Sequence, residues 1–406
     1  MKFLILVSDG MADTPIAALG DRTPMEVANQ PYLNGLARTA HVGTVLNVPE
    51  GMVPESDTAN LAILSYDPRT YSKGRSPLEA MSMGLTMSPE DTALRCNFVA
   101  ISENAETYED SIMLDHSAGE ITTDEARELV EALNTALADA ARRLYTGISY
   151  RHCLLWKGAD DTYDFTRPHD IIGKRIGEYL PKGPIGEPFY RFMRSSYDIL
   201  KDHPVNIRRR ERGLKAANSA WLWSPGKKPA LPSFQKKWGI DGSVISAVDL
   251  IKGIGLCAGM EVIDVPGATG NLHTNYRGKA EAAIEAFRRG RELVYIHVEA
   301  PDECGHCADA EGKVRSLEKI DGEILMPVCE FLRGEGEPYR VLVLPDHPTP
   351  CTIRTHTADP VPYMIYESDT PHIGVTAFTE ATAAACHHLI PDGTRLMELL
   401  LNRLPQ

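Results

Sequence analysis

Residues 340–351 read Arg-Val-Leu-Val-Leu-Pro-Asp-His-Pro-Thr-Pro-Cys, and this stretch decides the fold. The branched apolar run from Val341 to Leu344 is typical of a buried strand in a parallel sheet. Open α/β sheets place their chemistry just beyond the carboxyl ends of such strands, where Asp346 and His347 follow. Successive residues leaving a strand point in different directions, so this pair can reach two neighbouring cations. The alternative interpretation is a strand that ends in an ordinary proline-rich turn.

Two other apolar runs also lead into acidic residues. Residues 3–7 stop just before Asp9, and residues 293–298 open onto a segment with Asp302 and His306. The last two are four residues apart, so one helical turn or a compact loop brings both to one metal. Asp9 also has a purely structural interpretation as a turn residue held by backbone amides. Strands, turns and helices alternate here, as a doubly wound parallel sheet requires.

Ser56 or Asp57 begins a predicted apolar helix that runs to about residue 64. Unpaired N–H groups and the helix dipole favour negative charge at such a position. A serine there is most often an N-cap. It can instead be a nucleophile that a metal deprotonates and whose phosphoryl adduct rests on the backbone amides.

The composition indicates a globular chain with an ample core. Its 406 residues are 43% hydrophobic and 24% charged, enough for two domains or one large domain with an insertion. The formal net charge of −14 argues against nucleic acid or an anionic membrane as a partner. The N-terminal apolar run is too short for a signal peptide and no later run approaches a membrane span, so we expect a cytoplasmic protein. The eight scattered cysteines are typical of reduced thiols.

The domain organisation is expected to be discontinuous. Residues 224–232, Ser-Pro-Gly-Lys-Lys-Pro-Ala-Leu-Pro, form the clearest linker in the chain, and the sequence texture also changes near Thr86. We therefore expect one domain of residues 1–85 and 226–406, interrupted by an inserted α+β domain of residues 86–225.

Three helical features are expected around this insertion. Thr122 and Glu125 match a capping box, and the helix that follows is predicted to carry leucines as far as Leu144 on one face. The basic residues 208–210 are expected on a solvated helix face. Beyond the linker, a helix is expected through residues 244–253.

Cys304-Gly305-His306-Cys307 permits a different function. The same motif occurs in disulfide isomerases, where the first thiol lies at a helix N-terminus and has a depressed pKa. It is also half of a possible zinc site, but the chain has no second paired-cysteine motif to complete one. Acidic residues precede the motif and would raise the pKa of a thiol, which argues against an oxidoreductase.

Taken together, the motifs resemble those of the archaeal-type cofactor-independent phosphoglycerate mutases, which do not require 2,3-bisphosphoglycerate and belong to the alkaline phosphatase superfamily. The resemblance spans nearly the whole chain, and it implies an alkaline-phosphatase-like doubly wound α/β sheet with an inserted α+β domain. The motifs that carry it are residues 9–11 with Asp13, 55–59, 66–68, 74–80, 302–306, 346–350 and 356–362.

The resemblance implies two divalent cations, typically Mn²⁺, with Zn²⁺, Co²⁺ and Mg²⁺ as alternatives. Two metals about 3.5–4 Å apart can clamp the entering and leaving oxygens of an in-line phosphoryl displacement. The implied ligands are Asp302, His306 and His356 for one cation, and Asp9, Ser56, Asp346 and His347 for the other.

The implied reaction interconverts 3-phosphoglycerate and 2-phosphoglycerate through a phosphoserine at Ser56, so the partner is a small anionic phosphorylated substrate. Cations in turns are candidates for gripping that substrate, although each also fits an ordinary surface or structural role. These substrate-binding candidates are Lys73, Arg75, His116, His169, Lys252 and Lys279.

Two departures from the family pattern bear on the substrate. Family members commonly have an Asp-Arg-Arg-Ala-Gly-Arg turn in the inserted domain, where this chain has Asp-His-Ser-Ala-Gly-Glu at residues 115–120. Pro345 and Pro348 flank the Asp-His pair where Gly and Ser are usual. Phosphorylation of homoserine in threonine biosynthesis, proposed for relatives of this type, tolerates the loss of those arginines better. A metal-binding module without catalysis is the remaining alternative.

Overall fold

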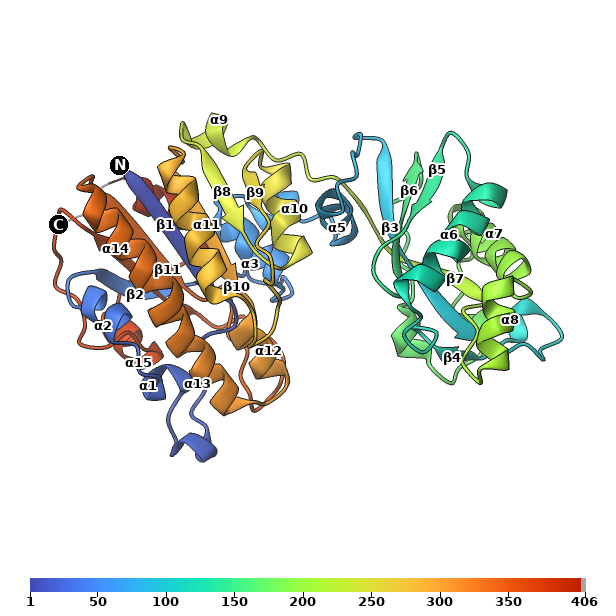
Figure 1. The fold of residues 1–406 in the computed structure, drawn as a ribbon, viewed down its shortest axis with the longest axis horizontal. Helices are drawn as coiled ribbons and strands as arrows, with labels where there is room; N and C mark the ends of the chain where they lie inside the picture. The colour runs from blue at the N-terminus through green and yellow to red at the C-terminus, as the bar shows by residue number, and fades with distance from the viewer. Residues whose placement is uncertain (403–406) are drawn as a thin grey trace. The chain divides into compact units, whose positions relative to one another are not determined.

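The computed structural model describes residues 1–402, which form two compact units (Figure 1). Unit 1 comprises Met1–Ser72 and the chain from Ala230 onward, and unit 2 comprises Lys73–Pro229. The inserted segment expected at residues 86–225 lies within unit 2. None of the helices in residues 1–402 is both long enough and apolar enough to span a bilayer.

Unit 1 is built on an eight-stranded sheet in the order β13-β2-β12-β11-β1-β10-β8-β9. The strands β11, β1, β10, β8 and β9 run parallel to one another, whereas β12 is antiparallel to both β11 and β2. The strands are β1 (Lys2–Ser8), β2 (His41–Val45), β8 (Gly242–Ile245), β9 (Glu261–Ile263), β10 (Leu293–Val298), β11 (Tyr339–Leu344), β12 (Val361–Glu367) and β13 (Leu389–Ile390).

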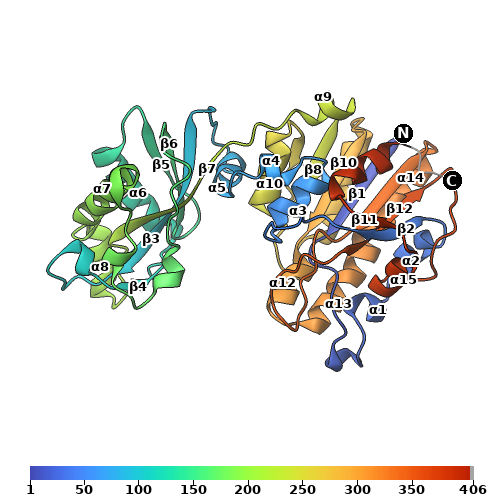
Figure 2. The ribbon, with the colours of Figure 1, turned by 180° about the vertical axis from the view of Figure 1, so that it is seen from behind.

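The central strands are buried on both faces, as their continuous apolar sequences predict. Every residue of β10 and β11 is buried, and Leu6 of β1 pairs with Ile296 on one side and Val343 on the other. Helices α11 and α14 cover the face seen in Figure 1, and α3 lies on the face seen in Figure 2. The doubly wound α/β arrangement predicted from the sequence is therefore confirmed.

The α-helices of unit 1 are α1 (Pro24–Val27), α2 (Pro31–Ala37), α3 (Ser56–Ile63), α4 (Pro68–Tyr71), α9 (Phe234–Trp238), α10 (Asp249–Cys257), α11 (Tyr276–Arg288), α12 (Ala300–His306), α13 (Ala310–Lys319), α14 (Met326–Glu335), α15 (Glu380–Ala385) and α16 (Leu396–Leu401). A π-helical turn, Ile320–Leu325, joins α13 to α14, and 3₁₀ turns occur at Ala17–Leu19 and Gly393–Arg395.

Unit 2 is an α+β unit with an antiparallel sheet in the order β4-β3-β6-β5, with β7 pairing along β3. Phe98 and Trp221 of the sheet share one buried core with Leu129 of α6 and Phe192 of α7. The elements are β3 (Asp91–Ile101), β4 (Met113–Asp115), β5 (Arg142–Tyr145), β6 (Arg151–Lys157), β7 (Ser219–Lys227), α5 (Ser76–Ser82), α6 (Thr123–Leu137), α7 (Gly183–Leu200) and α8 (Pro204–Glu211), with 3₁₀ turns at Tyr108–Asp110, Pro168–Ile171 and Ile176–Glu178.

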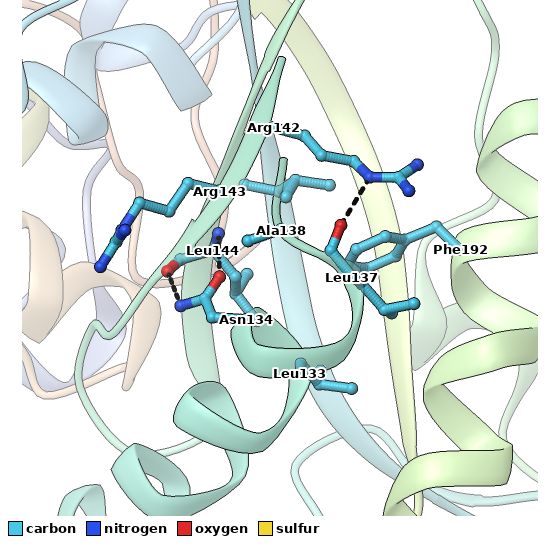
Figure 3. Close-up of a pocket in the computed structure, with 9 residues that line it drawn as sticks. Leu133, Asn134, Leu137, Ala138, Arg142, Arg143, Leu144 and Phe192 are labelled. Carbon is cyan, nitrogen blue, oxygen red and sulfur yellow. Dashed lines mark hydrogen bonds between the residues drawn. The ribbon is translucent and has the colours of Figure 1, made fainter. Parts of the chain in front are cut away.

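The prediction that α6 continues to Leu144 was wrong. The Thr122 cap is present, with its Oγ1 accepting from Glu125 N at 3.3 Å, but the helix ends at Leu137 and Leu144 lies in β5. Figure 3 shows why: Asn134 accepts from Leu144 N at 2.9 Å and donates to Leu144 O at 2.8 Å, while Arg142 Nε donates to Leu137 O. These bonds stabilise a turn between helix and strand, so the leucine spacing continues across two different elements.

Three further expectations were wrong. Arg209 is 2% exposed rather than solvated, because it pairs with Glu125 and donates to the carbonyl oxygen of Ala118. Residues 244 and 245 belong to β8, and the helix begins only at Asp249, since β-branched residues pack well in a sheet. The first part of the expected linker, residues 224–227, is the end of β7.

Candidate metal centre

Three adjacent parallel strands bring three aspartates to one edge of the sheet in unit 1. Asp9 follows β1, Asp302 lies in α12 directly after β10, and Asp346 follows β11. Their exposed fractions are 2%, 6% and 1%. Because β1 lies between β10 and β11, the three carboxylates are neighbours, and such a concentration of buried negative charge requires compensation.

One group of donors converges on Asp302. Its Oδ2 lies 3.2 Å from His306 Nε2 and its Oδ1 lies 3.3 Å from His356 Nε2. The two Nε2 atoms are 3.0 Å apart. The Nδ1 atoms of His306 and His356 lie 3.0 Å and 2.7 Å from carbonyl oxygens, to which only an N–H can donate. With Nδ1 as the donor to these carbonyl oxygens, the Nε2 atom of each neutral ring can ligate a metal, as is usual for ligating histidines.

A second group surrounds Ser56. Its Oγ lies 3.2 Å from His347 Nε2, which is 3.7 Å from Asp9 Oδ1 and 3.6 Å from Asp346 Oδ2. The His347 ring also stacks on that of His356, with centroids 3.9 Å apart. His347 therefore lies between the two groups, close to ligand candidates of both.

The charge balance of this centre fits divalent cations. Burial, followed by the neighbouring Asp346, Asp302 and Glu299 carboxylates, raises the pKa of Asp9 well above its usual value. Asp9 Oδ1 is buried without a hydrogen-bond partner. At the other group, the hydrogen bond to Asp302 is the largest cause that raises the pKa of His306 to about 9. Carboxylate oxygens crowded together with imidazole nitrogens form a donor set that suits Mn²⁺ or Zn²⁺.

Asn60 is a positioning residue that the sequence did not reveal. Its Nδ2 donates to Asp346 Oδ2 at 2.8 Å and to the Ser56 carbonyl oxygen at 2.8 Å, while its Oδ1 accepts from Tyr295. Asn60 thus links α3 to the β11 end and fixes Ser56 relative to Asp346. A single asparagine inside an apolar helix gives no pattern from which this role could be predicted.

His297 was also missed. This fully buried side chain of β10 has its Nε2 3.2 Å from Asp9 Oδ2. Burial, acting more strongly than the nearby carboxylates, lowers the pKa of His297 to about 4, so its ring is neutral. His297 lies five positions before Asp302, within a strand whose other residues are apolar. Its closeness to Asp302 in the sequence was the one sign that it belongs to the metal centre.

Two of the expected substrate-binding cations belong to unit 1. Lys252 in α10 forms an ion pair of 2.6 Å with Asp264. Lys279 in α11 is fully buried and donates from Nζ to the His297 carbonyl oxygen at 2.8 Å, and burial lowers its pKa to about 8.

The other four belong to unit 2. Lys73 is exposed, and Arg75 is half-buried at the start of α5. His116 and His169 are brought together, with ring centroids 6.0 Å apart. The ring of His169 also meets Trp223 edge-on at 5.7 Å.

The cysteines of the 304–307 motif do not form an activated dithiol. Cys304 is buried within α12, and burial raises its pKa to about 11. The neighbouring Glu303 carboxylate raises the pKa of the exposed Cys307 as well. Dithiol oxidoreductases need a thiol whose pKa is lowered. The eight cysteines are all free thiols, as expected.

Comparison with known sequences gives a consistent result. Residues 37–206 match the family model described as 2,3-bisphosphoglycerate-independent phosphoglycerate mutase. A relative of that name from Methanothrix thermoacetophila is 46% identical over 401 residues, covering 99% of this chain and 100% of the relative. A probable enzyme of the same name from Geobacter sulfurreducens is 44% identical over 404 residues, with 99% and 100% coverage.

Solved structures agree. A protein from Pyrococcus horikoshii superposes with a TM-score of 0.81 at 26% identity, covering 100% of this chain and 98% of its own. The cofactor-independent phosphoglycerate mutase from Thermoplasma acidophilum superposes with a TM-score of 0.68 at 27% identity, covering 99% of both chains. This chain matches these proteins in length, sequence and fold. It therefore belongs to the 2,3-bisphosphoglycerate-independent phosphoglycerate mutases.

Proposed function

We propose that this protein interconverts 3-phosphoglycerate and 2-phosphoglycerate by metal-dependent phosphoryl transfer through Ser56. One observation carries the proposal: Ser56, the first residue of α3, lies 3.2 Å from His347 Nε2 at the sheet edge where Asp9 and Asp346 are buried. The N–H groups in the first turn of a helix can hold the oxygens of a phosphoryl group beside that hydroxyl. The family membership supports the same reaction.

The residues that would hold two divalent cations are those that converge in the structure. When bound, the cations supply charge neutralisation at the phosphoryl oxygens and lower the pKa of the serine hydroxyl. The mixed carboxylate and imidazole donors suit Mn²⁺ or Zn²⁺, and we assign Mn²⁺. We assign one cation to Asp302, His306 and His356, and the other to Asp9, Ser56, Asp346 and His347.

The residues of the chain then carry out two matched half-reactions. Ser56 Oγ attacks phosphorus, so an Oγ–P bond forms while the bond from phosphorus to the 3-oxygen breaks. The proton lost by Ser56 balances the proton gained by the 3-oxygen of glycerate. In the second half the 2-hydroxyl loses its proton and its oxygen attacks phosphorus, so that a bond from phosphorus to the 2-oxygen forms while the Oγ–P bond breaks and Ser56 regains a proton. Asn60 holds the Ser56 backbone throughout, so the nucleophile keeps its place between halves.

Phosphorus NMR of the manganese-loaded protein with 3-phosphoglycerate alone tests this function. The 2-phosphoglycerate signal is expected to grow until the two isomers reach equilibrium, without 2,3-bisphosphoglycerate. A chelator-treated sample serves as the control and should show no conversion. A spectrum that stays unchanged although two equivalents of Mn²⁺ are bound would contradict the proposal.

A second candidate, phosphorylation of homoserine, is favoured by the turn at residues 115–120 in unit 2. That turn has no arginine, and its Asp115 forms an ion pair of 2.7 Å with Lys215. Burial opposes ionisation of Asp115, but bonds from Lys215 and Ser117 outweigh it and lower its pKa. The turn therefore presents a poor site for a phosphorylated acid and a better one for a neutral or zwitterionic acceptor.

The same spectrometer distinguishes the two candidates. Manganese-loaded protein with ATP and homoserine should yield a phosphomonoester signal only if homoserine is the acceptor. Turnover of 3-phosphoglycerate without turnover of homoserine would eliminate this second candidate.

A further inference from the structure

The buried imidazole of His297 lies among polar groups, although the other residues of its strand are apolar. Its Nδ1 lies 3.4 Å from Ser246 Oγ, which in turn accepts from Val248 N at 3.0 Å. Its Nε2 is completely buried and has no hydrogen-bond partner. Buried polar atoms of this kind are uncommon, because leaving one unsatisfied costs free energy.

The space in front of this nitrogen is lined by carboxylates. Asp9 Oδ2 lies 3.2 Å away, and donor atoms of Asp9, His297 and Asp346 all lie within 4.8 Å of one another. Two ligands of one metal, each about 2.1 Å from it, stand at most about 4.2 Å apart. Only small movements would therefore place all three donors around a single cation.

A hydrogen bond from His297 Nε2 to Asp9 Oδ2 is the simpler alternative to a shared cation. Asp9 Oδ2 is only 3.2 Å away, yet His297 Nε2 makes no hydrogen bond to it. A cation between the three side chains satisfies His297 Nε2 and the charge of Asp9 together. Ser246 then accepts from His297 Nδ1–H, which is how histidine ligands are commonly oriented.

We propose that His297 Nε2 is a ligand of the cation assigned to Asp9, Ser56, Asp346 and His347. The inference rests on the proposed metal-dependent function. Five protein donors exceed the four that Zn²⁺ usually takes, but they leave one position on a six-coordinate cation such as Mn²⁺. His297 would thus bias this site against Zn²⁺ and reserve one position for a substrate oxygen.

The test uses the full-length protein, stripped of metal and titrated with Co²⁺, whose visible absorption reports the kind and number of its ligands. Unmodified protein is expected to bind two equivalents. In His297→Gln the dissociation constant of one Co²⁺ should rise about 10-fold or more, and at saturation the absorption band of that ion should shift. The shift is the decisive result, because it reports replacement of a nitrogen ligand by oxygen.

The matched control is His152→Gln in unit 2. His152 is 4% exposed and its Nε2 also lacks a hydrogen-bond partner, so this side chain is buried like that of His297. It lies in unit 2, away from the aspartates of the metal centre. This variant should bind Co²⁺ like the unmodified protein, with the same spectrum.

Two outcomes would overturn different claims. Weaker Co²⁺ binding with an unchanged band at saturation would make His297 a positioning residue for Asp9 and reject it as a ligand. Unmodified protein that binds no Co²⁺ would instead reject the metal-dependent function itself. If His297→Gln does not fold, ¹⁵N NMR of unmodified, histidine-labelled protein decides the matter, since Cd²⁺ must move the Nε2 resonance of a ligand.

Discussion

Lys313 and Asp13 form an ion pair of 2.8 Å in which neither side chain is exposed to solvent. Lys313 Nζ also donates to the Thr349 carbonyl oxygen at 2.9 Å, and Asp13 accepts from Cys351 N. Thr349 in turn donates from Oγ1 to Asp302. The pair therefore connects α13 to the loops after β1 and β11, and through Thr349 to the proposed metal ligand Asp302.

Replacing Lys313 by Met should lower the free energy of unfolding by about 3–5 kcal/mol, because it leaves the Asp13 charge buried and unpaired. The double variant Lys313→Met with Asp13→Asn should recover part of that loss. Urea denaturation followed by fluorescence measures both values. Lys319→Met is a suitable control, since its half-exposed pair with Glu323 at 3.9 Å should contribute at most about 1 kcal/mol. A double variant less stable than Lys313→Met alone would contradict this account.

Ser56→Ala should abolish mutase turnover while both cations stay bound. The substitution removes the nucleophilic oxygen and leaves all the other proposed metal ligands, as well as the Asn60 bond to the residue 56 carbonyl, in place. Intact-protein mass spectrometry after acid quench should show a phosphoryl group on the unmodified enzyme and none on the variant. Ser88→Ala, which changes an exposed serine of unit 2, is the control and should retain activity. Near-normal turnover by Ser56→Ala would exclude Ser56 as nucleophile.

A histidine cluster at the start of β2 predicts acid sensitivity. The His41 ring stacks on His388 at 4.8 Å and meets His372 at 6.2 Å, with Glu367 and Tyr363 also facing it. Burial, then the charges of His388 and His372, lower the pKa of His41 to about 4. Between about pH 6.5 and pH 4 the unfolded state therefore binds a proton that the folded state does not, and stability falls as the pH falls.

His41→Asn should flatten this pH dependence. The expected gain at the acid end is about 1 kcal/mol, well below what the full pKa difference implies, because the ring is half-exposed. Thermal unfolding from pH 7 to pH 4.5 measures it, with His273→Asn, a change at an exposed histidine, as control. Parallel curves for His41→Asn and unmodified protein would show that His41 does not titrate in this way.

The sequence predicted those parts of the molecule that repeat a pattern. Asp9, Asp302 and Asp346 each follow an apolar run, so the sequence alone locates these strand ends. The end of α6 could not be predicted from the sequence, because leucines at helical spacing continue to Leu144. Only the hydrogen bonds between Asn134 and Leu144 show that a turn separates the helix from β5. His297 is a single polar residue in an apolar strand, and Lys313 is one of several charged residues in α13, so no pattern marks either of them. Their partners are distant in the chain.

The order of the sheet has a consequence for synthesis on the ribosome. β1 is the first strand made, yet both of its neighbours, β10 and β11, lie beyond residue 290. At about 5–20 residues per second, roughly 15–70 s pass between the emergence of β1 and that of β11. Unit 2 is one continuous stretch of chain and can fold during this interval. Until β10 emerges late in this interval, the apolar residues of β1 have no neighbouring strand, which makes the nascent chain a natural client for holding chaperones.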